Sequence, residues 1–196
     1  NDSLARIKMS IRDKKLPGYD FDRLMVFHDF NTESYKPMIN YPETKNITPN
    51  SSLGYTLFEF EESADSIDFT LLKTDKLQNQ FTLHGFNFAS NDAGITYHTI
   101  GVNGAQVESY LKCEYFIPHL KALNPNWIIV SLGTNDVYTN NFDSIEFALN
   151  LNRFINNLKT SAPNSAILLT TPGDHKIKRQ FINTNTKIAS NIIKQK

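Results

Sequence analysis

The chain has 196 residues, of which 40% are hydrophobic and 20% charged, which is enough apolar material for a folded core and too much for a disordered chain. Its 20 basic and 20 acidic side chains cancel, so no overall field attracts nucleic acid or an anionic membrane surface. The single cysteine excludes an internal disulfide and a cysteine-based zinc cluster. The balanced charge favours a substrate that is neutral or is recognised only locally.

The first half of the chain has the pattern of short β-strands. Residues 5–11 alternate apolar and polar side chains, which is the period of a half-buried strand. Further β-rich runs follow, at residues 24–28, 55–60, 67–71 and 81–88. Turn-forming residues separate them at 16–18 and over the polar stretch 41–54. Several short strands joined by loops predict an all-β jelly roll or sandwich over residues 1–94.

No segment of the sequence is expected to enter a membrane. The longest good apolar run, Trp127–Val130, is far below the roughly 20 residues that a spanning helix needs. The first residues do not form a signal peptide, and the chain does not begin with Met. We therefore expect a processed chain or an excised piece.

From about residue 95 the period changes to that of alternating helices and strands. Helices are predicted at 106–123, 144–160 and about 183–196, the second capped by Asp143 or Ser144. Between them, 127–132 and 166–171 are apolar runs typical of parallel strands that are buried on both faces. Residues 95–196 are thus predicted to form part of an α/β domain with a doubly wound parallel sheet.

Ligands of such a sheet bind at the carboxyl ends of its strands, which directs attention to the loop from Gly133 to Asp136. Gly133 permits a tight exit from the strand, and Asn135 places a carboxamide, a neutral N–H donor, above the sheet. A simpler reading is that Asn135 and Asp136 only form a turn and a helix cap. The preceding apolar strand and Gly-Thr favour a functional role.

This loop resembles the third signature block of SGNH hydrolases, the GDSL-like lipases and acylhydrolases, in which the Asn donates to an oxyanion. About thirty residues upstream, the segment from Ile100 to Ala105 resembles the second block, whose Gly backbone N–H serves the same oxyanion hole. The likeness extends over residues 95–196 and implies a flavodoxin-like, three-layer SGNH fold. By this resemblance, Gly104 and Asn135 form the oxyanion hole. The β-rich first half, joined directly to the second block, is similar to bacterial SGNH esterases with a jelly-roll insertion, such as peptidoglycan or polysaccharide O-acetylesterases.

Two parts of the family's machinery are not found. The nucleophile belongs to a Gly-Asp-Ser block after a strand, but no strand precedes Asn1-Asp2-Ser3, and Ser3 is expected to begin a strand instead. The base belongs to an Asp-x-x-His block, and Asp174-His175 has the wrong spacing. We interpret Ser3 as a coincidence and His175 as part of a polar loop. The chain is therefore expected to be truncated at both ends.

The other histidines are expected to be structural, because they lie in or beside apolar elements; they are His28, His84, His98 and His119. None of them has metal-ligand spacing such as His-x-x-x-His, so neither zinc nor another cofactor is predicted.

The resemblance implies a segment of a serine esterase that hydrolyses O-acyl, above all O-acetyl, esters of a glycan or another small ester, in a secreted, periplasmic or cell-envelope setting. An alternative is a carbohydrate-binding module on an inactive α/β scaffold, with exposed aromatics such as Tyr35, Tyr41 or Tyr55 holding the sugar. A third possibility is that the β-rich half only shapes the rim of the active site.

Overall fold

The structure, a computed structural model, describes residues 3–12, 18–138, 141–177 and 181–196. It divides the chain into two compact units, Asn1–His98 and Thr99–Lys196. The turn predicted at residues 16–18 lies mostly outside the described residues.

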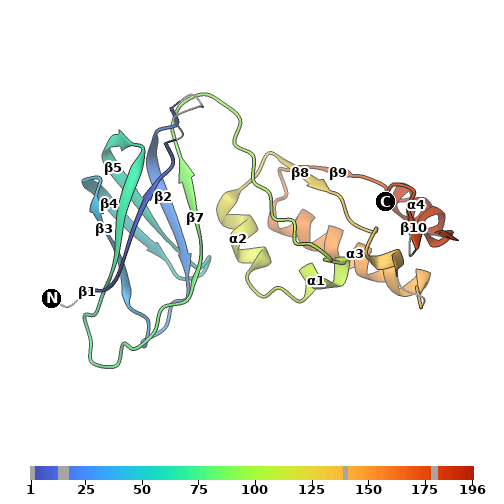
Figure 1. The fold of residues 1–196 in the computed structure, drawn as a ribbon, viewed down its shortest axis with the longest axis horizontal. Helices are drawn as coiled ribbons and strands as arrows, with labels where there is room; N and C mark the ends of the chain where they lie inside the picture. Colours follow the sequence, from blue (N-terminus) through green and yellow to red (C-terminus); the bar gives the residue numbers. More distant parts are fainter. Residues whose placement is uncertain (1–2, 13–17, 139–140, 178–180) are drawn as a thin grey trace. The chain divides into compact units, whose positions relative to one another are not determined.

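The first unit consists of strands that form two antiparallel sheets (Figure 1). The strands are β1 (Ser3–Ser10), β2 (Phe21–His28), β3 (Lys36–Tyr41), β4 (Thr44–Asn50), β5 (Tyr55–Ala64), β6 (Ser66–Leu72) and β7 (Leu83–Ala89). The strand order is β1-β6-β3 in one sheet and β4-β5-β2-β7 in the other. The strands predicted around residues 5–11, 24–28, 55–60, 67–71 and 81–88 are therefore present.

The two sheets share one hydrophobic core. Phe21 and Phe58 from one sheet and Phe69 from the other are almost completely buried in the same cluster. Some ring pairs of this core meet edge to face, among them Phe21 and Phe88 with centroids 4.8 Å apart, an arrangement that aromatic quadrupoles favour. The abundance of phenylalanine in the sequence is thus explained in large part by this core.

Two strands, β3 and β4, were not predicted, and β4 lies inside the stretch 41–54 that was expected to be a loop. Both strands are at sheet edges, where only one side needs a partner. The side chains of β4 are nearly all exposed, so its polar sequence Thr-Lys-Asn-Ile-Thr-Pro-Asn shows no alternation. An edge strand has a neighbouring strand on one side only, so a residue without a backbone N–H is tolerated where it faces the open side. This fits Pro37 in β3 and Pro49 in β4.

His28 is a buried member of the first unit and has hydrogen bonds at both ring nitrogens. Its Nε2 lies 2.9 Å from Thr56 Oγ1, and its Nδ1 lies 2.8 Å from the carbonyl oxygen of Asp29. The ring stacks between Phe30 and Phe81. Burial lowers the pKa of His28, and the bond to the Asp29 carbonyl offsets this only in part.

We expect this histidine to make the first unit less stable in mild acid. His28 binds a proton more readily in the unfolded chain than in the folded one. Its contribution to stability is therefore complete above the ordinary histidine pKa of about 6.5 and decreases as the pH falls below that value. His28→Gln should flatten the pH dependence of the free energy of urea unfolding between pH 7.5 and 5. His98→Gln, at an exposed position, is the control; an equal effect of both substitutions would contradict the prediction.

The second unit contains a pair of parallel strands with helices packed against one face (Figure 1). Its elements are α1 (Val107–Leu111), α2 (Phe116–Leu123), β8 (Trp127–Val130), the 3₁₀-helix η1 (Asp136–Tyr138), α3 (Ser144–Ser161), β9 (Ala166–Leu169), β10 (Lys176–Ile177), β11 (Phe181–Ile182) and α4 (Asn185–Lys194). Strands β8 and β9 pair in parallel register, Trp127 opposite Ala166. This is the β-α-β arrangement that the sequence predicted.

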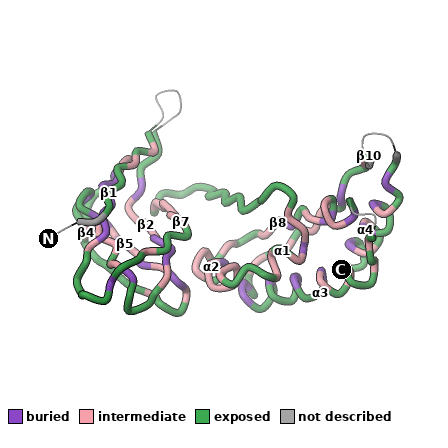
Figure 2. The backbone as a smooth tube through the Cα atoms, turned by 60° about the horizontal axis from the view of Figure 1, so that its bottom comes forward, coloured by how far each residue is buried: buried purple, intermediate pink, exposed green. Residues whose placement is uncertain are grey.

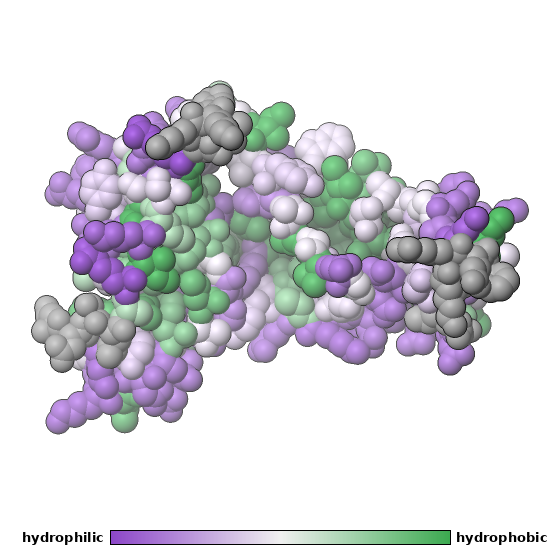
Figure 3. All heavy atoms as spheres, viewed as in Figure 1, coloured by the Kyte–Doolittle hydropathy of each residue, from purple (hydrophilic) through white to green (hydrophobic). Residues whose placement is uncertain are grey.

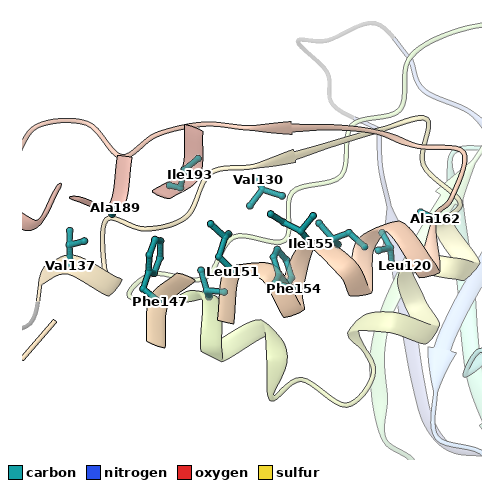
Figure 4. Packing of buried hydrophobic residues seen from close by; sticks show 12 residues of the cluster. Leu120, Val130, Val137, Phe147, Leu151, Phe154, Ile155, Ala162, Ala189 and Ile193 are labelled. Atoms are coloured by element: carbon teal, nitrogen blue, oxygen red, sulfur yellow. The ribbon is translucent and has the colours of Figure 1, made fainter. Parts of the chain in front are cut away.

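Helix α3 supplies the largest share of the second core. Its buried side chains recur three or four residues apart and form one apolar stripe; they are Phe147, Leu151, Phe154, Ile155 and Leu158. Figure 4 shows side chains of this stripe pointing toward Val130 of β8 and toward Ala189 and Ile193 of α4. The helix begins at the predicted cap, since the Asp143 carboxylate accepts hydrogen bonds from the backbone N–H groups of Ile145 and Glu146.

The helix predicted over residues 106–123 is in fact two helices, α1 and α2. Pro118 explains the interruption, because its ring would clash with the carbonyl of Glu114 in a continuous helix and it has no N–H to donate. In the observed structure Pro118 lies in the first turn of α2, where proline is tolerated. Asn124, in the left-handed conformation, ends α2 at the predicted position.

The prediction that the parallel strands are buried on both faces is wrong for this structure. One face of the pair packs on the helices, whereas Trp127, Ile129 and Leu168 on the other face are 70%, 60% and 48% exposed. Figure 3 shows hydrophobic side chains at the surface over β8 and β9. Among the described residues, no element of the second unit covers this face.

Candidate active site

The loop after β8 makes its tight turn at Gly133. This residue has a φ of 112°, a conformation that side chains disfavour. The Gly133 carbonyl accepts a hydrogen bond from Val137 N–H at 3.1 Å, and the Asn135 carbonyl accepts one from Tyr138 N–H at 3.2 Å. These bonds close the short helix η1, so the glycine sets the direction in which Asn135 and Asp136 leave the strand.

Gly133→Ala should lower the free energy of unfolding by about 1–3 kcal/mol through backbone strain. A Cβ at this position would lie 3.5 Å from both Ile193 Cδ1 and Pro172 Cγ, which is ordinary contact, so steric overlap adds little. Urea unfolding measures the loss, and Gly94→Ala, at an open position without a positive φ, is the control. If Gly133→Ala is as stable as the parent chain, the prediction is wrong, because the turn then adopts another backbone conformation without strain.

A second tight turn precedes α1 and contains Gly104. Its φ is 80°, and Ala105 N–H donates to the Val102 carbonyl across the turn at 3.1 Å. Nothing lies within 4 Å of the position that a Gly104 Cβ would occupy, so glycine serves the backbone conformation here and not a close contact. Among the described residues, the Gly104 N–H donates no hydrogen bond.

Three hydrogen bonds join the two turns. The Asn135 side chain donates through Nδ2 to the Ala105 carbonyl at 2.9 Å, and the Gln106 side chain donates to the Asn135 carbonyl at 3.1 Å. The backbone N–H of Val107 donates to Asp136 Oδ1 at 3.0 Å. The structure thus brings the Gly104 turn and the Asn135 loop together, although they are about thirty residues apart in the sequence.

This geometry leaves the Asn135 carboxamide with donor capacity. A carboxamide nitrogen carries two hydrogens, and the bond to the Ala105 carbonyl uses one of them while fixing the orientation of the group. Preoriented N–H donors in a loop at the carboxyl end of a strand are suited to stabilise an oxyanion. Because the donor is held before any ligand arrives, it needs little reorganisation.

Asp136 connects the two turns through a buried carboxylate. Its Oδ1 accepts the bond from Val107, while Oδ2 is buried and has no hydrogen-bond partner among the described residues. Burial raises the pKa of Asp136, and backbone N–H groups, that of Val107 among them, offset this in part. The Asp136 carboxylate therefore holds the start of α1, which precedes it in the chain. A simple cap would instead hold the helix that follows Asp136.

His175 lies in a network within the second unit. Its Nε2 lies 2.9 Å from Asn183 Nδ2, and its Nδ1 lies 3.2 Å from the Gly173 carbonyl oxygen. The buried Asn183 also donates to the Val137 carbonyl at 2.8 Å. Both ring nitrogens thus have partners in this loop.

Ser3 belongs to β1 of the first unit. Its backbone is paired opposite Leu72 of β6, so it occupies a strand and not a loop at the carboxyl end of a parallel strand. The structure therefore places Ser3 in the kind of element that the alternation of residues 5–11 predicted.

The remaining histidines have ordinary surroundings. His84 Nε2 lies 2.8 Å from Asp29 Oδ1. His119 stacks on Tyr115 at a centroid distance of 5.5 Å, and His98 is exposed. Within the described ranges, no three His, Cys, Asp or Glu side chains lie close enough together to hold a metal ion.

The three tyrosines considered for sugar binding differ in exposure. Tyr35 packs against the first core, and Tyr55 is half-buried with its ring edge-on to Phe27. Tyr41 is 53% exposed. A platform made of all three is therefore not present on the described surface.

Sequence reasoning missed Gln106 and the Ala105 carbonyl, which together fix Asn135. The role of the Ala105 carbonyl could not have been predicted, because every residue has a backbone carbonyl and the sequence does not distinguish this one. Gln106 carried a weak signal, because it stands at the start of the helix predicted over residues 106–123. In the structure its backbone N–H donates to Ser109 Oγ at 3.1 Å.

Comparisons with known proteins agree on one fold. The sequence model of the GDSL-like Lipase/Acylhydrolase family matches residues 31–195. A solved structure described as "Peptidoglycan O-acetylesterase in action, 5 min" resembles the chain with a TM-score of 0.66 and 16% identity, over 96% of this chain and 52% of that one. The chain thus spans about half the length of that structure. Curated proteins give no match.

Proposed function

Because the chain belongs to the GDSL-like lipase/acylhydrolase family of SGNH hydrolases, we propose that it is the oxyanion-hole segment of a serine esterase. The observation that supports this most directly is the pair of joined turns, with the Gly104 N–H and the Asn135 carboxamide as donors. In ester hydrolysis the carbonyl oxygen gains negative charge in the tetrahedral intermediate, and donors fixed beforehand stabilise it.

The proposed mechanism needs two groups that we do not assign within this chain. A serine oxygen attacks the ester carbonyl while a histidine removes its proton, and the same histidine then protonates the leaving alcohol. Ser3 lies in a paired strand, and His175 has both ring nitrogens in hydrogen bonds. We therefore propose that nucleophile and base come from other parts of the parent polypeptide.

We propose O-acyl groups of a glycan, O-acetyl above all, as the substrate. The structural neighbour is described as a peptidoglycan O-acetylesterase, and the balanced charge of the chain does not oppose a neutral ester. A secreted, periplasmic or cell-envelope location goes with this substrate. No helix in the described part of the chain is long and apolar enough to span a membrane.

The domain organisation is part of the same proposal. Residues 1–94 would form an accessory β-sandwich or jelly roll, and residues 95–196 would form part of the SGNH α/β domain. The two antiparallel sheets with one core and the parallel β8–β9 pair are consistent with this division.

Hydrolysis of 4-nitrophenyl acetate tests the assignment of roles. We expect the chain alone to release nitrophenol at the rate of buffer, because it contributes donors and no nucleophile. Turnover that disappears in Ser3→Ala or His175→Ala would refute the proposed division of the machinery.

A further inference from the structure

The first unit contains a hollow of about 410 Å³ that the proposed esterase mechanism does not use. It lies along β7 and the segment that follows it, and its walls include Tyr19, Asn87, Phe88, Ile95, Tyr97 and His98. Figure 2 shows the chain after β7 as exposed over a long stretch. The volume is within the range of small-ligand sites, about 300–1,000 Å³.

Aromatic rings at this hollow, here called the β7 groove, are unusually accessible. Tyr97 is 81% exposed and Tyr19 is 45% exposed. Tyr19 is held in place, because its hydroxyl donates to the Phe88 carbonyl at 3.5 Å, whereas Tyr97 has no hydrogen bond or ring contact among the described residues. Ile95 beside it is 98% exposed. Such a cluster of exposed apolar side chains is typical of a binding surface.

The polar groups of the groove make few hydrogen bonds within the protein. The Asn87 amide donates to the sulfur of Met25 at 3.9 Å, and a thioether is a weak acceptor. His98 and Thr96 are exposed. Among the described residues, no Asp, Glu, Lys or Arg lines the groove. A fitting ligand therefore combines apolar C–H faces with hydroxyl or amide groups and carries no charge of its own at the contact.

We propose that the β7 groove binds a neutral oligosaccharide, with sugar rings stacked on Tyr97 and Tyr19 and a hydroxyl or acetamido group bound to Asn87. The choice of a glycan rests on the proposed function, whereas the groove itself is defined by its lining. A peptide added to the edge of β7 fits less well, because Tyr19 already occupies the Phe88 carbonyl that such a peptide would need.

Calorimetric titration of the chain with the β-1,4-linked tetramer of N-acetylglucosamine tests the proposal. We expect saturable binding that Tyr97→Ala and Tyr19→Ala each weaken by about tenfold or more, as truncation of an aromatic anchor does. Leu77→Ala, at an exposed apolar side chain outside the groove, should leave the affinity unchanged. Circular dichroism of each variant verifies the fold.

Three results would overturn the proposal: no saturable binding of the tetramer at millimolar concentration, binding that survives both groove substitutions, or preferential binding of tetra-alanine. The test needs no nucleophile, so it is separate from the esterase. Saturable binding without esterase activity in any form of the protein would reject the proposed function and support the binding proposal for the β7 groove. Esterase activity without binding would support the proposed function and reject the binding proposal.

Discussion

Replacing Asn135 by Ala is expected to lower the kcat of the parent esterase by about 10²–10³-fold, the usual effect of removing one oxyanion-hole donor. The side chain is oriented by its bond to the Ala105 carbonyl at 2.9 Å, and its second hydrogen is available for the oxyanion. Because charge on the carbonyl oxygen develops in the transition state, KM should change much less than kcat. The assay is steady-state hydrolysis of 4-nitrophenyl acetate by the polypeptide that also carries the nucleophilic serine.

Two further variants separate donor loss from loosening of the loop. Asn135→Asp keeps the size of the side chain but loses the N–H donors, so it should be at least as inactive as Asn135→Ala. Asn157→Ala removes an exposed amide from α3 and should retain the parent kcat. Full activity of Asn135→Asp would show that Asn135 has only a structural role.

The sequence was sufficient to predict the α/β part because its signals are local. The apolar run at β8 and the spacing of Phe147, Leu151 and Phe154 in α3 each predict their element without knowledge of any other. The same holds for the glycines of the two turns, since a positive φ restricts the choice of residue. Membership of the family was predicted from these turns and is confirmed by the family match.

The failures have physical reasons as well. Strand β4 is mostly polar and exists because β5 offers it a ladder, which no pattern within residues 44–50 reveals. The exposure of Trp127 depends on what covers the sheet, and not on the strand itself. The division between α1 and α2 was in principle predictable from Pro118, because a proline cannot lie in the interior of a regular helix.

Substitution of Asp136 is expected to affect stability in opposite directions for Ala and Asn. Asp136→Ala removes the acceptor of the Val107 N–H and should lower the free energy of unfolding by about 1–3 kcal/mol, the cost of an unpaired buried donor. Asp136→Asn keeps an oxygen for this bond. Its amide nitrogen replaces Oδ2, which has no hydrogen-bond partner among the described residues, so the count of hydrogen bonds stays the same.

The expected direction of the stability change in Asp136→Asn follows from the raised pKa of Asp136. Burial makes the folded protein hold the proton of Asp136 more tightly than the unfolded chain, whose ordinary pKa is 3.8. The contribution of this group to stability is therefore complete below pH 3.8 and is lost as the pH rises through the higher pKa of the folded state. At pH 7 the buried charge costs stability, and the neutral amide removes that cost.

We accordingly expect Asp136→Asn to unfold at higher urea concentration than the parent chain at pH 7, with the difference shrinking as the pH approaches 4. Asp143→Asn, at the exposed cap of α3, serves as the control and should show no such gain. A loss of stability in Asp136→Asn of similar size at both pH values would mean that the negative charge itself is needed. If the expected sign is observed, Asp136 joins the two turns at a cost in stability, as is common for groups that keep a functional site in position.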